Sequence, residues 1–255
     1  MTHKNALFSL LTVLLLLGGC STTRGVNDQV QEYNDPKDPI ESFNRTMWDF
    51  NYDVLDVYIL RPTAVAYTNY MPQFARTGLL NMARNLEEPS NSLNNLLQGK
   101  VDGTFISLGR FLLNSTVGVL GLIDVASELG IDPQEEEFGE VLGKWGVDTG
   151  PYLMLPAWGP TDIRSGVGDI VDTSYSPLDS LNFYASLFRT GIKVLEARAA
   201  VIAQEQQLNS SADPYSFVKS AYFQNLEFKV KDGKVEVSEE EKALDEDIDA
   251  FLEDL

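Results

Sequence analysis

The sequence has a single histidine, His3, and a single cysteine, Cys20, among its 255 residues. His3 lies in a predicted signal peptide, and Cys20 stands at its end. Without an imidazole or a free thiol, the mature chain cannot form a Ser-His-Asp or Cys-His catalytic centre or an ordinary zinc site. No P-loop is present, and no GxGxxG follows an apolar strand. We therefore expect no metal and no cofactor, and only carboxylates, lysines or tyrosines remain for chemistry.

Basic residues are also scarce. The chain has 19 Lys and Arg against 38 Asp and Glu, a formal net charge of −19. Binding to nucleic acid requires a basic face that neutralises phosphates, so we expect no nucleic-acid partner. Because an acidic body gains nothing from anionic headgroups, attachment to a membrane should rest on a lipid anchor and on apolar contacts.

Residues 1–19 read as a signal peptide. Lys4 supplies a positive start, and Ala6–Leu17 form an apolar stretch of the length usual for signal peptides. The LGGC that ends at Cys20 resembles the lipobox of bacterial lipoproteins, in which the cysteine is acylated after cleavage. The alternatives are a plain signal peptide with a chance cysteine, or an anchor that is not cleaved.

The residue after the lipobox indicates the membrane in which a lipoprotein is retained. Ser21 stands where an aspartate would indicate retention in the inner membrane, so resemblance to enterobacterial sorting implies the outer membrane. Several acyl chains anchor a protein stably, whereas one does so only marginally. Residues 20–35 are polar and without periodicity, and we interpret them as a lipidated tether.

Two stretches combine apolar residues with glycine. Residues 110–126, RFLLNSTVGVLGLIDVA, are somewhat shorter than the roughly 20 apolar residues that span a bilayer. Gly118 and Gly121 in this run each cost a helix roughly 1 kcal/mol relative to alanine. Glycine is favoured despite this cost where a segment must bend or where another backbone approaches closely. Both explanations remain open from the sequence.

The second stretch, residues 138–164, holds five glycines and three prolines, and no helix of normal length survives that density. It is nevertheless too apolar for a solvated loop. Irregular backbone is tolerated at membrane depth only where it is buried in protein or lines a watery cavity. The alternative is a long, well-packed loop of a soluble protein.

Elsewhere the chain predicts many short helices that begin at prolines. Asp38 is suited to cap a helix that has Pro39 at its first position and Glu41 at its third. Residues 228–237 alternate around Asp-Gly, a strong signal for a β-hairpin. Residues 238–255 are acidic and read as a solvated tail. We expect a mainly α domain at 36–228, followed at 229–255 by the hairpin and the acidic tail.

DPIESFNR at 38–45 resembles the opening motif of the MlaA family, also called VacJ, of outer-membrane lipoproteins. Ile40 replaces the usual Phe or Leu. The resemblance continues through NLEEP at 85–89, through both glycine-rich stretches, and through DPY at 213–215. It covers residues 36–228, with a region around 130–137 that is shorter than in some relatives.

The resemblance implies a ring-like arrangement of many short helices around a central amphipathic channel, in the inner leaflet of the outer membrane. Misplaced phospholipid would pass through the channel to a periplasmic carrier, which maintains lipid asymmetry. The expected partners are phospholipid, the outer membrane, a trimeric porin and the periplasmic lipid carrier of an ABC-transporter system. The family is not enzymatic.

The resemblance also implies roles for particular residues. Gly118, Gly121 and Asp124 would form a gating hairpin at the channel, and Asn44 and Arg45 would help to hold it. The alternative is close packing for the two glycines, an ordinary helix cap for Asp124, and a buried structural network for Asn44 and Arg45. The residues expected as a structural motif around the channel are Asp38, Pro39, Phe43, Asn44, Arg45, Arg110, Asn114, Trp145, Gly150, Pro151, Tyr152 and Arg164.

Three further alternatives stay open. Trp145, Tyr152 and Trp158 suit either an aromatic belt at a membrane interface or a protein core. Glu87 or Glu88, paired with Asp124, would be the carboxylates of a cell-wall glycosidase. A scaffold lipoprotein that binds a porin without transporting lipid is the third alternative.

Overall fold

A computed structural model describes residues 35–175 and 183–234. It is mainly helical, with one small antiparallel hairpin, which confirms the predicted fold class. Residues 1–34, which include Cys20, and the acidic tail lie outside the described residues. The elements are α2 (Glu41–Asp49), η1 (Phe50–Leu60), α3 (Arg61–Tyr70), α4 (Gln73–Asn85), α5 (Glu88–Leu97), α6 (Val101–Thr116), α7 (Val125–Glu128), α8 (Phe138–Lys144), β1 (Tyr152–Leu155), β2 (Gly159–Asp162), α9 (Ile163–Tyr175), α10 (Phe183–Ala200), η2 (Ile202–Gln204), α11 (Glu205–Asn209) and α12 (Pro214–Val230).

Several helix starts follow the sequence signals. α5 and α12 carry proline in their first turn, and Asp213 caps α12 by accepting a hydrogen bond from Ser216 N. The cap predicted at Asp38 is wrong, because α2 begins at Glu41 with Ile40 in the capping position. The Asp38 carboxylate instead accepts hydrogen bonds from the side chains of Asn44 in α2 and of Tyr215 and Lys219 in α12, so it is not available to the helix end.

The hairpin lies elsewhere than the Asp-Gly signal predicted. Tyr152 pairs with Asp162 and Leu155 with Gly159 in β1 and β2. Residues 228–230, expected to begin a strand, instead form the last turn of α12, and the turn at 231–233 follows that helix. Lys229 contacts Glu137 at 3.2 Å and Glu140 at 3.1 Å and so holds this turn against α8; tertiary contacts outweigh local strand propensity. Residues 235–237 lie outside the described part.

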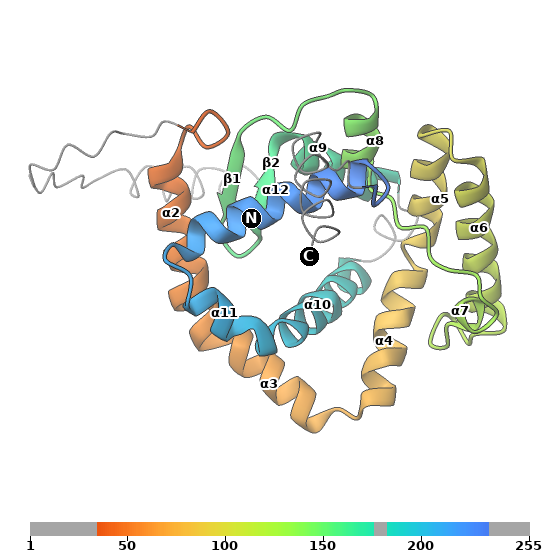
Figure 1. Cartoon of the computed structure of the whole chain (residues 1–255). Coiled ribbons are helices and arrows are strands. Elements are labelled where there is room, and N and C mark those ends of the chain that lie inside the picture. Colours follow the sequence, from red (N-terminus) through yellow and green to blue (C-terminus); the bar gives the residue numbers. More distant parts are fainter. Residues whose placement is uncertain (1–34, 176–182, 235–255) are drawn as a thin grey trace, which may run out of the picture. The chain divides into compact units, whose positions relative to one another are not determined.

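Within residues 35–234, α10 and α12 are central to the arrangement (Figure 1). α10 packs against α3 and α4, whereas α12 packs against α8 and α11. The hairpin packs on α2 through β1, and α5 packs on α6. No helix among the described residues is both long enough and apolar enough to cross a membrane.

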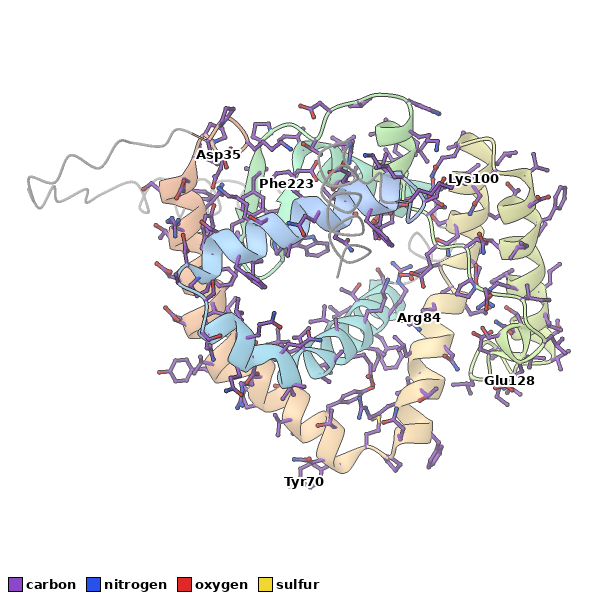
Figure 2. The ribbon with its side chains drawn as sticks, in the orientation of Figure 1. Asp35, Tyr70, Arg84, Lys100, Glu128 and Phe223 are labelled. Carbon is purple, nitrogen blue, oxygen red and sulfur yellow. The ribbon has the colours of Figure 1, made fainter. Side chains whose placement is uncertain are left out.

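The buried core is small and aromatic. Tyr152, Met154 and Tyr215 are fully or almost fully buried, and Tyr222 and Phe223 pack against them from α12. Phe223 is partly buried against this core, whereas the Tyr70 side chain at the end of α3 is 88% exposed (Figure 2). Many other large apolar side chains are exposed in the same way, so the core accounts for only part of the apolar residues.

Candidate functional site

The first candidate region is the sharp turn that follows α6. Val119 and Leu120 have φ values of 54° and 59°, in the left-handed region that L-residues rarely adopt. Each such residue costs roughly 1–2 kcal/mol. Both side chains, with those of Val117, Leu122 and Ile123, are exposed. The turn therefore presents an apolar surface on a strained backbone, and strain of this kind persists only where surrounding contacts over-determine it.

Arg110 supplies those contacts. Its side chain is 5% exposed, and its Nε donates to Glu88 Oε1 at 2.6 Å. Its Nη2 donates to both carboxylate oxygens of Asp124, at 3.0 and 3.2 Å. Asn114 also donates to Asp124, at 2.9 Å, and accepts from Ala126 N. We call Glu88, Arg110, Asn114 and Asp124 the Arg110 clasp; it joins α5, α6 and the start of α7.

Asp124 is a helix cap as well as an ion-pair partner. Its Oδ1 accepts from Ser127 N, and its Oδ2 accepts from Ser127 Oγ at 2.6 Å. Burial alone would raise the pKa of the Asp124 carboxyl, but the hydrogen bonds from Ser127, Asn114 and Arg110 outweigh it and lower the pKa to about 2. Asp124 is therefore ionised at neutral pH, with its lone pairs engaged.

The glycines of the turn are in close contact with their surroundings. A Cβ on Gly118 would lie 2.2 Å from Ile123 O and 2.5 Å from Asn114 O, which are both backbone atoms. Gly121 has a φ of 89°, and a Cβ there would lie 2.7 Å from Asn85 Cβ. The backbone contacts of Gly118 support close packing, whereas the positive φ of Gly121 fits a bend in the chain as well as close packing.

Asn44 belongs to a second buried cluster. It donates to Asp38 at 2.7 Å and to Tyr152 O at 3.0 Å, and its Oδ1 accepts from Met154 N. Asp38 also accepts from Tyr215 and Lys219. These bonds join α2 to β1 and α12, so Asn44 is part of a buried structural network.

Arg45 binds the same helix, α12. Its guanidinium donates to Asp213 through two nitrogens, at 2.7 and 3.1 Å, and lies 4.4 Å from the centre of the Tyr215 ring. Hydrogen bonds from Arg45 and Ser216 lower the pKa of the Asp213 carboxyl far below its usual range, against the effect of burial. Asn44 and Arg45 thus join α2 to β1 and α12, whereas the Arg110 clasp holds the turn after α6.

The remaining predicted residues are distributed over the upper elements of Figure 1. Arg164 is buried and donates to Val147 O at 3.1 Å, and Gly150 has a φ of 69°. Trp145 is 56% exposed and donates to Leu97 O. Tyr152 is fully buried, so it belongs to the core rather than to an exposed belt. Pro39, Phe43 and Pro151 are exposed.

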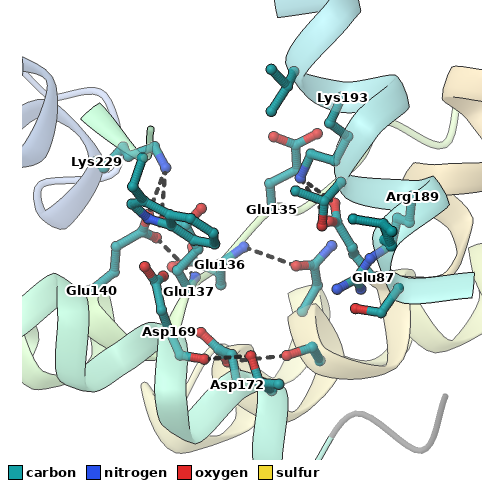
Figure 3. Close-up of a pocket in the computed structure, with 18 residues that line it drawn as sticks. Glu87, Glu135, Glu136, Glu137, Glu140, Asp169, Asp172, Arg189, Lys193 and Lys229 are labelled. Atoms are coloured by element: carbon teal, nitrogen blue, oxygen red, sulfur yellow. Dashed lines mark hydrogen bonds and ion pairs between the residues drawn. The ribbon is translucent and has the colours of Figure 1, made fainter. Parts of the chain in front are cut away.

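Sequence reasoning did not identify a cavity of about 580 Å³ that lies between α10 and the elements around it (Figure 3). In Figure 3, Arg189 and Lys193 from α10 lie on one side of the cavity, Lys229 and Glu140 lie on the other, and Asp169 and Asp172 from α9 lie at the bottom of the view. Lys229, near the end of α12, also lines it. Lys193 contacts Glu87 at 2.6 Å, and Lys229 contacts Glu140 at 3.1 Å. We call this the charged cavity.

Carboxyls outnumber bases in this cavity, and that imbalance shifts their pKa values. Glu140 is 4% exposed; burial, a hydrogen bond with Glu136 and the charge of Glu137 raise its pKa to about 8 despite Lys229. Burial and neighbouring carboxylates likewise raise the pKa of Asp169 to about 6. Glu140 is therefore largely protonated at neutral pH, whereas Asp169 takes up a proton only as the pH falls towards 6.

The free energy of unfolding should depend on pH through Glu140. The folded state retains a proton that an unfolded glutamate, with its ordinary pKa of 4.5, has already lost. The folded state therefore binds more protons than the unfolded state, and stability falls as pH rises from 4.5 to about 8. Glu140→Gln should remove this part of the slope and be more stable than the wild type above that range.

Urea unfolding at several pH values tests this expectation. Glu128→Gln is the matched control, because Glu128 is exposed on α7 and should leave the pH dependence unchanged. If the free energy of unfolding depends on pH in the same way in Glu140→Gln as in the wild type, Glu140 is ionised over the whole range from pH 4.5 to about 8.

A second cavity, of about 520 Å³, lies beside the other halves of α10 and α12. Its walls come mainly from η1, the hairpin, η2, α11 and the start of α12, and are largely apolar. α10 contributes Arg198, and α12 contributes Phe217 and Val218. We call this the apolar cavity. α10 lines the charged cavity with its earlier residues and the apolar cavity with a later residue, whereas α12 lines them in the reverse order. The two helices therefore run antiparallel past the two cavities.

The cavity residues carried only weak signals in the sequence. Asp169 and Asp172 are three apart on α9, and Arg189 and Lys193 are four apart on α10, so each pair shares a helix face. Such pairs are common on solvated helices. No group of His, Cys, Asp or Glu among the described residues has a geometry that would hold a metal ion.

Comparisons with known proteins agree on one family. A family model described as "MlaA lipoprotein" matches residues 36–229. A protein of Haemophilus influenzae and one of Escherichia coli K12, both named "Intermembrane phospholipid transport system lipoprotein MlaA", are 38% and 40% identical to the chain. The matches cover 94% and 89% of this chain, and 96% and 90% of those proteins.

Solved structures include a related fold. A structure described as "Structural basis for maintenance of bacterial outer membrane lipid asymmetry" aligns with a TM-score of 0.71 and 44% sequence identity. The alignment covers 76% of this chain and 98% of that one.

Proposed function

The chain belongs to the MlaA lipoprotein family, and on that premise we propose that it keeps the outer membrane asymmetric. It removes mislocalised phospholipid from the outer leaflet and passes it to a periplasmic carrier. The partners are phospholipid, a trimeric porin and the carrier of an ABC-transporter system. The transfer is a movement of lipid without a catalytic step.

The observation that carries this proposal is the pair of cavities along α10 and α12. One cavity is lined by charged side chains and the other mainly by apolar ones. A phospholipid has a polar headgroup and apolar acyl chains, so a polar and an apolar compartment beside the same helices match its two parts. We call the space that includes both cavities the α10–α12 passage, and we assign it as the amphipathic channel.

The exposed apolar surface supports embedding in a leaflet. Val101, Phe105, Leu108 and Leu112 recur along α6 at spacings of three or four residues, and all are exposed. The exposed apolar turn at 117–123 continues this surface. An apolar surface of this kind marks contact with protein or membrane. Because the chain is acidic, it should enter the leaflet by apolar contact and by an acylated Cys20, which intact-mass analysis would detect.

The glycosidase alternative is weakened by the Arg110 clasp. Glu88 and Asp124 both bind Arg110, and each is engaged by further hydrogen bonds. Neither Glu88 nor Asp124 lines the charged cavity or the apolar cavity. A low pKa also leaves Asp124 unsuited to act as a general acid.

Filling the charged cavity tests the transport proposal. Thr190 and Val194 line it from α10, so Thr190→Trp combined with Val194→Trp should narrow the passage. We expect cells with this variant to accumulate outer-leaflet phospholipid to the level of cells without the protein, while protein amount and melting temperature stay near those of the wild type. Phospholipase accessibility of intact cells measures the effect.

Ala197→Trp combined with Ala200→Trp is the matched control. Both alanines lie on α10, and neither lines the charged cavity or the apolar cavity. This control should retain normal lipid asymmetry. If the cavity-filled variant is also normal, lipid does not use the α10–α12 passage, and a scaffold that binds porin without transporting lipid becomes the better explanation.

A further inference from the structure

Asp169 is an accessible carboxylate of the charged cavity. It lies on α9, it lines the cavity, and it is exposed. In the part of the chain that the structure describes, its carboxylate accepts no hydrogen bond and forms no ion pair; the groups that influence it act through their charges. A ligand that enters the cavity can therefore reach both carboxylate oxygens.

The charges around Asp169 are mostly negative. Glu137, Asp172 and Asp162 act on its carboxylate from neighbouring positions. Lys229 opposes them, but it already forms an ion pair with Glu137, at 3.2 Å. Burial and these carboxylates raise the pKa of Asp169 to about 6, so the ionised form that prevails above that pH lacks a compensating charge. A cation bound beside Asp169 would supply it.

The lining of the cavity as a whole is also acidic. The described residues that line it include seven carboxyls and three bases. Because Glu140 is largely protonated at neutral pH, six carboxylates remain against three cations. An anionic ligand therefore enters against the net charge of the cavity, whereas a ligand with a cationic end does not.

Trp158 offers a second kind of contact to a cation. It lies in the turn between β1 and β2, is 64% exposed and lines the same cavity. The face of an indole ring attracts alkylammonium groups. In the described part of the chain, the lysines and arginines that lie over rings contact Phe223, Tyr215 and Tyr67 instead. The Trp158 ring and the Asp169 carboxylate thus remain open to a ligand in one space of about 580 Å³.

We propose that the charged cavity binds the headgroup of an amine-bearing phospholipid, with the terminal ammonium between the Asp169 carboxylate and the Trp158 ring. The inference rests on the proposed function and adds a rule of headgroup specificity to it. Phosphatidylethanolamine brings a cation together with its phosphate, whereas phosphatidylglycerol brings a phosphate alone. The cavity should therefore bind phosphatidylethanolamine in preference to phosphatidylglycerol.

Competition binding to the purified full-length protein in mild detergent tests the rule. The probe is phosphatidylethanolamine with a fluorophore on one acyl chain, so that its headgroup is unaltered. The unlabelled competitors share their acyl chains and are phosphatidylethanolamine, its N-acetyl derivative and phosphatidylglycerol. At about pH 7.5, phosphatidylethanolamine should compete about tenfold better than either of the others, which corresponds to about 1.4 kcal/mol. Glycerophosphoethanolamine, the same headgroup without acyl chains, should not compete at these concentrations.

Asp169→Asn supplies the variant. Asparagine keeps the shape of the side chain but removes its charge, so phosphatidylethanolamine and its N-acetyl derivative should compete equally in this variant. Asp102→Asn is the matched control, because Asp102 is exposed on α6 and lines neither the charged cavity nor the apolar cavity. It should keep the preference of the wild type.

The pH dependence of the preference separates ligand contact from a structural role of Asp169. Asp169 takes up a proton as the pH falls through about 6, whereas Glu140 stays largely protonated below pH 8. The preference for phosphatidylethanolamine should therefore be smaller at about pH 5 than at about pH 7.5 in the wild type. In Asp169→Asn it should be absent at both pH values. A preference that is equal at both pH values in the wild type would contradict a contact with Asp169.

The outcomes separate the inference from the function. Phosphatidylethanolamine that competes no better than its N-acetyl derivative in the unaltered protein overturns the inference but leaves phospholipid binding intact, and this comparison does not depend on whether any variant folds. Competition by glycerophosphoethanolamine as strong as that by the lipid would assign the cavity to a soluble amine and would also overturn the inference. If no lipid binds, the proposed function and the inference fail together.

Discussion

Arg110→Met should lower the free energy of unfolding by about 3–5 kcal/mol, the cost of removing one partner from a buried ion pair. The Arg110 and Glu88 side chains are 5% and 3% exposed, so no water can replace the lost donor. For a domain of this size, the melting temperature should fall by roughly 6–20 °C, at about 2–4 °C per kcal/mol.

Thermal and urea unfolding measure this effect. Arg84→Met is the matched control, because the Arg84 side chain is 58% exposed and its carboxylate partner lies 4.0 Å away. A surface pair of this kind contributes between about 0 and 1 kcal/mol. Adding Glu88→Gln to Arg110→Met should recover part of the loss, since it removes the buried charge. Equal, small effects of Arg110→Met and Arg84→Met would contradict the structural role of the clasp.

Gly118→Ala should also destabilise the protein, by roughly 1–3 kcal/mol as an overpacked position. The new Cβ would approach two backbone oxygens, at 2.2 and 2.5 Å, and backbone cannot move aside as a flexible side chain does. Gly109→Ala is a close control within α6. A Cβ on Gly109 would meet no neighbouring atom within 4 Å, so alanine there should stabilise the helix by up to about 1 kcal/mol.

The two alanine variants also separate the hinge from the packing explanation. If Gly118 only supplied backbone freedom, Gly118→Ala would keep its melting temperature and alter outer-leaflet phospholipid. If Gly118 serves close packing, melting temperature, protein amount and lipid asymmetry should change together, while Gly109→Ala remains normal. Normal stability in Gly118→Ala would therefore refute close packing as the reason for this glycine.

The strained turn and the Arg110 clasp have a joint consequence. Val119 and Leu120 keep left-handed backbone because Arg110, Asn114 and Asp124 hold both ends of the turn. The exposed apolar side chains are thus presented on a fixed backbone rather than on a loose loop. We expect the turn to lose its shape when the clasp is broken, before the aromatic core unfolds.

Local patterns in the sequence predicted much of the fold. Prolines and Asp213 mark helix starts, and the density of glycine and proline in 138–164 marks the irregular region that contains the hairpin. Asp38 and the 228–237 hairpin show where such patterns fail. In each case a contact with a distant part of the chain overrides the local pattern. Tyr215 binds the Asp38 carboxylate, and Lys229 binds Glu140.

The site was less predictable, for a physical reason. Motif residues such as Asn44 and Arg110 are buried polar groups whose partners lie up to 110 residues away, so their roles depend on the assembled fold. The cavity residues Asp169, Lys193 and Arg198 stand on ordinary amphipathic helices. Only the approach of α10, α12 and the elements around them makes these residues line the two cavities.

The most direct test of the central claim is mass spectrometry of lipid that co-purifies with the full-length protein in mild detergent. We expect phospholipid bound to the wild type and to the Ala197→Trp, Ala200→Trp control, and much less on the cavity-filled Thr190→Trp, Val194→Trp protein. Equal phospholipid on all three proteins, or none on the wild type, would contradict a lipid path along α10 and α12.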